Sequence, residues 1–152
     1  MSIPVRLLLL TFVMSLIHTV SAGEPLPLIH PLFSDHMVFP RDVEAPVWGW
    51  TEPGKEITVT LAGKTAKAIA DTTGRWQTKL GPIAAGGPYE FFISGPTTHK
   101  LGDVLVGDVW LCGGQSNMEF ALNGTTNANQ EVAAANHHNI RLFHVPKRMS
   151  PI

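Results

Sequence analysis

The stretch that decides the fold reads Glu56-Ile57-Thr58-Val59-Thr60-Leu61. Apolar and polar side chains alternate strictly through it, which places the three apolar side chains on one face of a strand. The same alternation, or a short apolar run, recurs between turn residues at 37–39, 47–50, 65–71, 75–80 and 89–93. Several short strands at this spacing, without helical periodicity, predict an antiparallel β-sandwich. We expect Trp48, Trp50 and Trp76 to fill its core.

The pattern changes at Gly107. Residues 109–112 form a continuous apolar run, which is typical of a strand buried on both faces of a parallel sheet. Residues 127–138 read as a short helix capped by Asn127, and residues 140–145 alternate loosely like another strand. Strand, helix and strand begin an α/β unit, but such a domain needs on the order of 100 to 200 residues. We therefore expect residues 107–152 to be an incomplete α/β domain or, alternatively, an appendage packed on the sandwich.

Residues 1–22 have the pattern of a secretory signal peptide. Arg6 precedes an apolar run over 7–20, and small residues lead to Ala22. The run is shorter than the ~20 residues that a membrane-spanning helix needs, although an uncleaved anchor is the alternative. We expect cleavage after Ala22, a mature sandwich over residues 23–106, and a secreted or periplasmic protein with no membrane attachment.

Charge and cysteine content narrow the function classes. Eleven basic and twelve acidic residues give a net charge of −1 without any run of like charge, so nothing favours nucleic-acid binding. The one cysteine, Cys112, excludes an internal disulfide and a multi-cysteine metal site, and we expect it to be a buried thiol. His30, His36 and His99 lack the spacing of metal ligands. The oligomeric state stays open.

One block could carry chemistry, and it reads Gly107-Asp108-Val109-Trp110-Leu111-Cys112-Gly113-Gly114-Gln115-Ser116-Asn117-Met118. A buried strand that ends in glycines can present the Ser116 hydroxyl to solvent, with backbone N–H groups aimed at a developing oxyanion. A serine also needs a base within hydrogen-bond reach. The block departs from the G-x-S-x-G elbow at Met118, and the spacing alone equally fits Ser116 as a turn or cap residue.

The block resembles the nucleophile block of the sialate O-acetylesterase family, a branch of the SGNH (GDSL-like) hydrolases. The typical family sequence is G-D-V-W-L-C-S-G-Q-S-N-M, which this chain matches except at Gly113. Further similar segments are 35–41, 47–50 with 53–54, 74–76, 87–89 and 139–143. The resemblance covers about residues 28–145. It implies an immunoglobulin-like or galactose-binding-like sandwich followed by the first strand, helix and strand of an SGNH domain.

The resemblance implies a serine esterase that removes acetyl groups from sugar hydroxyls, chiefly of O-acetylated sialic acids, without a metal or cofactor. Ser116 would be the nucleophile and its backbone N–H an oxyanion donor, while Gln115 and Asn117 would bind substrate. Turn hydrogen bonding explains Gln115 and Asn117 equally well. The family's Asp and His have no matching block here, so we assign neither a base nor an acid and expect this chain alone to be inactive.

Other interpretations stay open at this point. Surface placement suits His137, His138 and His144 better than a role as base, and Asp108 fits a loop carboxylate. A different class of function is a non-catalytic sandwich module that binds glycans or another protein. A third is an acetyl esterase for other polysaccharides such as xylan.

Overall fold

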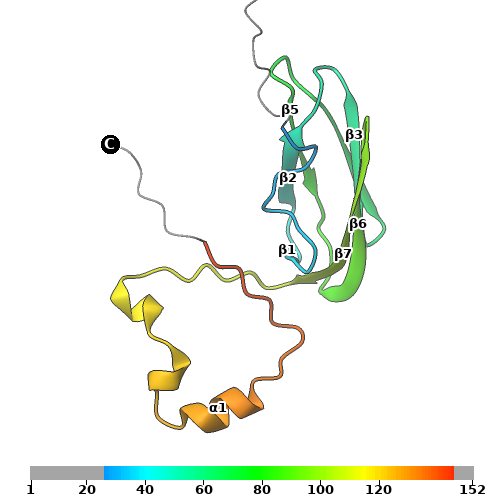
Figure 1. The fold of residues 1–152 in the computed structure, drawn as a ribbon. Helices are drawn as coiled ribbons and strands as arrows, with labels where there is room; N and C mark the ends of the chain where they lie inside the picture. The colour runs from blue at the N-terminus through cyan, green and yellow to red at the C-terminus, as the bar shows by residue number, and fades with distance from the viewer. Residues whose placement is uncertain (1–25, 146–152) are drawn as a thin grey trace, which may run out of the picture.

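The computed structural model describes residues 26–145, so the predicted signal peptide lies outside the described residues. Most of the ordered structure is sheet (Figure 1). The strands are β1 (Val38–Pro40), β2 (Ala45–Trp50), β3 (Glu56–Leu61), β4 (Lys64–Ile69), β5 (Arg75–Leu80), β6 (Gly86–Ser94) and β7 (Thr98–Gly107). The helical elements are the short 3-10 turns η1 (Ser116–Glu119) and η2 (Leu122–Gly124) and the helix α1 (Ala128–Ala134).

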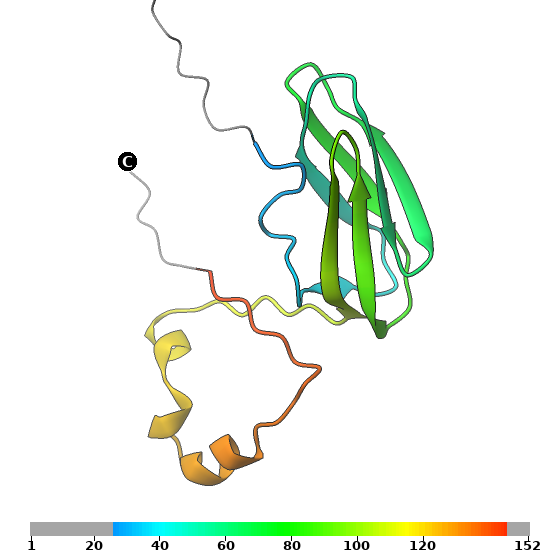
Figure 2. The ribbon, with the colours of Figure 1, turned by 45° about the vertical axis from the view of Figure 1, so that its right-hand side comes forward.

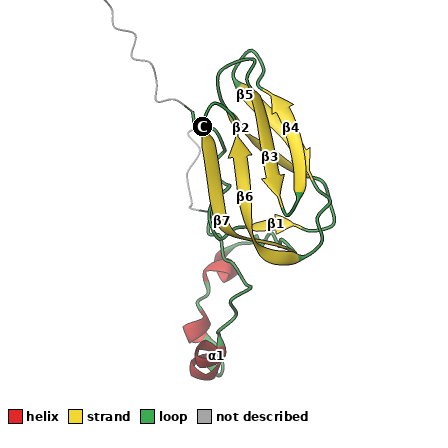
Figure 3. Ribbon diagram, turned by 90° about the vertical axis from the view of Figure 1, so that its right-hand side faces the viewer, coloured by secondary structure: helices red, strands yellow, loops and turns green. Residues whose placement is uncertain are grey.

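Five strands form a curled mixed sheet in the order β1-β7-β6-β3-β4, and β2 pairs with β5 in a separate two-stranded sheet (Figure 3). Thr78 Oγ1 on β5 donates a hydrogen bond of 3.0 Å to the carbonyl of Lys67 on β4. This contact draws the two sheets together along one edge.

The expectation of a wholly antiparallel sheet is wrong at one pair of strands. β1 and β7 run parallel, with Val38 opposite Leu105 and Phe39 opposite Val106. A parallel pair needs a long connection, and here the strands β2 to β6 lie between the two partners along the chain. With three residues, β1 is too short for its sequence to indicate a direction.

The alternation in the sequence corresponds to burial in the structure. In β3, Ile57, Val59 and Leu61 are buried, whereas the intervening side chains face outward. β3 and β4 are joined by the turn at Ala62 and Gly63, both in the left-handed region with φ of 48° and 76°. Two successive positive φ values fit a tight hairpin turn.

Side chains from both sheets form the core. Trp76 on β5 is 1% exposed, and its indole Nε1 donates a hydrogen bond of 2.8 Å to the carbonyl of Leu28. Trp48 is half-buried and packs against the core, and Trp50 is also half-buried. The ring of His30 lies beside both indoles, 5.2 and 5.6 Å away. The prediction of three core tryptophans is therefore confirmed for Trp76 and wrong for the full burial of the other two.

Beyond β7 the chain leaves the sheets and returns (Figures 1 and 2). Two strand predictions are wrong in this segment. Residues 109–112 and 140–145 form no strand, and Leu111 and Leu142 are 96% and 94% exposed. Within residues 26–145 no strand pairs with either run, so an apolar sequence alone gives neither pairing nor burial.

The predicted helix over 127–138 is shorter in the structure. α1 has seven residues, none of them buried, and Asn127 lies in the left-handed region without a side-chain capping bond. A single short helix without a packed face is marginal, which accounts for its early end. Cys112 is exposed, so the expectation of a buried thiol is also wrong.

Candidate active site

The candidate site lies on the segment that leaves β7. Asp108 is the first residue after the strand, and its Oδ1 accepts a hydrogen bond of 2.8 Å from Arg41 Nε. The Arg41 backbone N–H also donates to the carbonyl of Gly107, 3.0 Å away. The hydrogen bond and charge of Asp108 raise the pKa of the Arg41 guanidinium above its usual value. Asp108 therefore fixes the start of the segment, in agreement with its prediction as a loop carboxylate.

Ser116 is the first residue of the turn η1, and Gln115 and Asn117 flank it. All three side chains are exposed. The Met118 N–H donates to the Gln115 carbonyl at 3.0 Å, and the Phe120 N–H donates to the Asn117 carbonyl at 3.2 Å. The first N–H groups of a helical turn have no acceptor within that turn, and the Ser116 N–H is one of them.

The two glycines before Ser116 differ in how much space a side chain would have at each position. A Cβ at Gly113 would meet no atom within 4 Å, so the serine that the resemblance leads one to expect there would fit. A Cβ at Gly114 would lie 2.8 Å from Cγ of Met118, which is a flexible side chain. The departure from the family block at Gly113 therefore does not alter the shape of the turn.

None of the described histidines serves as a base for Ser116. His137, His138 and His144 are exposed, and no histidine within residues 26–145 is hydrogen-bonded to the Ser116 hydroxyl.

The described part of the chain contains no cluster of three or more histidine, cysteine or acidic residues suited to a metal ion. No helix among these residues is both long and apolar enough to cross a bilayer.

Large apolar side chains are exposed throughout this segment. Trp110 is 84% exposed, and from residue 108 to residue 145 none of the side chains is buried. The other large exposed side chains here are Val109, Leu111, Met118, Phe120, Leu122, Val132, Ile140, Leu142, Phe143 and Val145. An apolar surface of this extent is typical of a segment that packs against further polypeptide.

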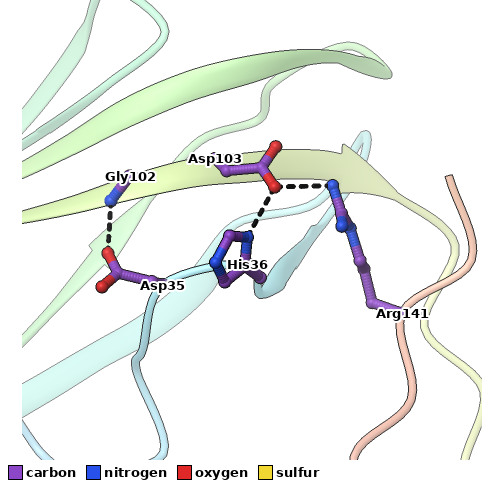
Figure 4. A network of polar contacts seen from close by, with 5 residues as sticks. All are labelled: Asp35, His36, Gly102, Asp103 and Arg141. Carbon is purple, nitrogen blue, oxygen red and sulfur yellow. Dashed lines mark hydrogen bonds and ion pairs between the residues drawn. The ribbon is translucent and has the colours of Figure 1, made fainter. Parts of the chain in front are cut away.

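Asp103 on β7 is the centre of a polar cluster that the sequence did not indicate (Figure 4). Oδ2 of Asp103 accepts hydrogen bonds from His36 Nδ1 at 2.6 Å and from Arg141 Nη2 at 2.8 Å. The His36 hydrogen bond and the Arg141 charge hold the Asp103 pKa below its usual value of 3.8. Asp103 is 67 residues from His36 and 38 from Arg141, so no local pattern could have found the cluster.

Comparison with known proteins gives the class and the family. No family model matches the chain. The chain is similar to a carbohydrate acetylesterase of known structure from Xanthomonas citri, with 47% identity and a TM-score of 0.67 over 74% of this chain and 26% of that one. The sialate O-acetylesterase of Rattus norvegicus is 32% identical over 156 aligned residues, 93% of this chain and 28% of its own length. That of Mus musculus is 33% identical over 124 residues, 73% of this chain and 23% of its own length.

These relatives are esterases of acetylated carbohydrates, and this is the class of protein to which the chain is similar. The chain belongs to a sialate O-acetylesterase-like family. It spans between 23% and 28% of the length of the rodent relatives.

Proposed function

We propose that this chain is the nucleophile-bearing part of a carbohydrate O-acetylesterase, with Ser116 as the nucleophile. The observation that carries the proposal is its 47% identity to a solved carbohydrate acetylesterase. The exposure of Ser116 on a turn just beyond a sheet supports it. In this assignment residues 23–106 are a β-sandwich accessory module, and residues 107–152 belong to an SGNH hydrolase domain.

The chemistry follows from acyl transfer to a serine. The Ser116 oxygen attacks the acetyl carbonyl while its proton passes to a base, and the Ser116 N–H accommodates the negative charge on the carbonyl oxygen. When the tetrahedral intermediate collapses, the bond to the sugar oxygen breaks, the base returns its proton to that oxygen, and the sugar hydroxyl leaves behind an acetyl-serine. Water then adds to that ester, which yields acetate and the free serine. Gln115 and Asn117, which are exposed on either side of Ser116, would hydrogen-bond the sugar.

We infer that the base and the oxyanion donors other than Ser116 come from polypeptide outside residues 26–145. Two observations support this inference. No described histidine reaches Ser116, and the exposed apolar runs at 109–112 and 140–145 suit the strands of a larger parallel sheet. Export through a signal peptide over residues 1–22, to the periplasm or outside the cell, is part of the same proposal, and N-terminal sequencing of the exported protein tests it.

Acetate release tests the proposal, with O-acetylated sialic acid and p-nitrophenyl acetate as substrates. The 152-residue chain should release no more acetate than its Ser116→Ala variant. A chimera in which residues 26–145 replace the matching segment of the Xanthomonas citri acetylesterase should be active and should lose activity with Ser116→Ala. Turnover by the chain alone that depends on Ser116 would refute the claim of a missing base. A folded but inactive chimera would refute the nucleophile assignment.

The same assay separates the possible sugars. Comparison of O-acetylated sialic acid with acetylated xylan distinguishes a sialate esterase from an esterase of other polysaccharides. Both substrates share the acetyl carbonyl, so Ser116 has the same role in either case.

One groove favours a second candidate function, glycan binding by the sheet module, by which we mean the two sheets formed by β1 to β7. An open groove of about 390 Å³ is lined in part by Trp50, Thr51, Glu52 and Thr73. An aromatic face beside hydroxyl and carboxylate groups is a combination that suits a sugar ring. Glycan binding that persists in Ser116→Ala and is lost in Trp50→Ala would support this function, and equal binding by both variants would refute it.

A further inference from the structure

The segment that carries Ser116 has no apolar anchor. From residue 108 to residue 145 only Ala128 and Arg141 are even half-buried. Burial of apolar side chains therefore does not hold the segment against the sheet module. Its position depends on polar contacts, and side-chain contacts near its two ends join it to the sheet module.

The first contact fastens the start of the segment. Arg41 Nε donates to Asp108 Oδ1 at 2.8 Å, directly beyond the last residue of β7. The second fastens its return, where Arg141 Nη2 donates to Asp103 Oδ2 at 2.8 Å. Both ribbon views show the returning chain crossing the departing one (Figures 1 and 2). Ser116 thus lies on a loop that is closed at both ends.

Asp103 is itself held in place by the chain that precedes β1 (Figure 4). His36 Nδ1 lies 2.6 Å from Asp103 Oδ2, and the His36 N–H donates to the Gly102 carbonyl at 3.1 Å. Asp35 Oδ1 accepts the Gly102 N–H at 2.6 Å. His36 and Asp103 both have positive φ, 64° and 52°, a conformation that persists where the surroundings fix it. The carboxylate therefore has a defined direction before Arg141 reaches it.

We propose that Asp103 is a positioning residue, the shared acceptor through which His36 and Arg141 fix where the loop 108–141 lies on the sheet module. The proposal rests on the proposed function only in that Ser116 is the group being positioned. Arg141 Nε is buried and has no hydrogen-bond partner among the described residues, so Nη2 alone makes this contact. Lysine, which has a single charged nitrogen, should therefore be able to make the same contact with Asp103 in place of Arg141.

Distance measurements by double electron–electron resonance test the proposal without relying on activity. Cys112 is the only cysteine and is exposed, four residues before Ser116, so it takes one spin label. Gln77→Cys on the exposed face of β5 supplies the second label. The parent protein should give a narrow distance distribution between these two sites in the 152-residue chain.

Asp103→Asn and Arg141→Gln should each lose the narrow peak. Asparagine tolerates positive φ, so Asp103→Asn removes the charge without disturbing the backbone. Arg141→Lys, which keeps a charged donor at this position, should retain the narrow peak. The double variant Asp103→Asn with Arg141→Gln should give a distribution no broader than that of either single variant. Lys67→Gln removes the pair of Lys67 with Glu56, which lies within the sheet, and is the matched control that should change nothing.

The pH dependence of the distance distribution separates a role of the Asp103 charge from a general structural role of this residue. The groups that face Asp103 are His36 and Arg141, with Asp35 beside them. The narrow peak of the parent should be lost as the pH falls through the lowered pKa of Asp103, whereas Asp103→Asn should lack that peak already at pH 7. Unchanged widths in Asp103→Asn and Arg141→Gln, or equal broadening in the Lys67→Gln control, would overturn the proposal.

Discussion

Replacement of Trp76 by phenylalanine should destabilise the sheet module. The indole is 1% exposed, and its Nε1 donates a hydrogen bond of 2.8 Å to the carbonyl of Leu28. Phenylalanine keeps an aromatic ring in the core but has no donor. The Leu28 carbonyl would lose this partner in a place where the substituted ring excludes water.

The magnitude follows from two contributions. A buried acceptor that loses its donor costs about 1–3 kcal/mol. The smaller ring leaves a void, which adds about 1 kcal/mol. The free energy of unfolding should therefore fall by roughly 2–4 kcal/mol, which lowers the melting temperature of a module of this size by roughly 10–25 °C.

Thermal unfolding followed by circular dichroism measures the effect, and the chain provides a matched control. Trp110 is 84% exposed, so Trp110→Phe makes the same chemical change without affecting the core. The control should unfold within about 0.5 kcal/mol of the parent. Equal melting temperatures for Trp76→Phe and Trp110→Phe would refute the reasoning that the indole hydrogen bond and ring packing stabilise the core.

Three further predictions follow from single positions. Gly49→Ala should abolish the cooperative unfolding transition, because its Cβ would lie 2.0 Å from the carbonyl oxygen of Leu28; a cooperative transition near that of the parent would contradict this. Hydrogen bonds from Thr73 keep the Asp71 pKa below its usual value of 3.8, so their stabilisation is present above that pH and is lost as the pH falls through the lowered pKa. Asp71→Asn should therefore lower the melting temperature at pH 7 and weaken its dependence on acid, which parallel melts at pH 7 and pH 3 measure. Gly113→Ser should leave the melting temperature unchanged, since a Cβ there meets no atom within 4 Å, and a loss of several degrees would count against the described turn.

The sequence predicted the sheet where one face of a strand is buried and the other is not. The alternation over 56–61 and 75–80 corresponds to β3 and β5 with the expected residues inside. β7 was not assigned as a strand of its own, because its first half is exposed and polar and only Val104 and Val106 show the alternation. Period-2 patterning thus identifies strands only along their half-buried lengths.

The segment beyond β7 shows why the rest could not be predicted. The apolar run at 109–112 predicts a buried strand, but burial requires neighbouring strands, and none lies beside the run within residues 26–145. The turn around Ser116 was predicted from its glycines and polar residues, which are local signals. The contact between Asp103 and Arg141 joins residues 38 apart in the sequence and needed the fold.

Acetate release by the chimera is the most direct test of the assignment of Ser116. Residues 26–145 in place of the matching segment of the Xanthomonas citri acetylesterase should give a folded enzyme that deacetylates a sugar ester. Ser116→Ala in that chimera should lower kcat by at least about a thousandfold, as expected for loss of a nucleophile. A Ser116→Ala chimera that folds and still releases acetate at the parent rate would contradict the account.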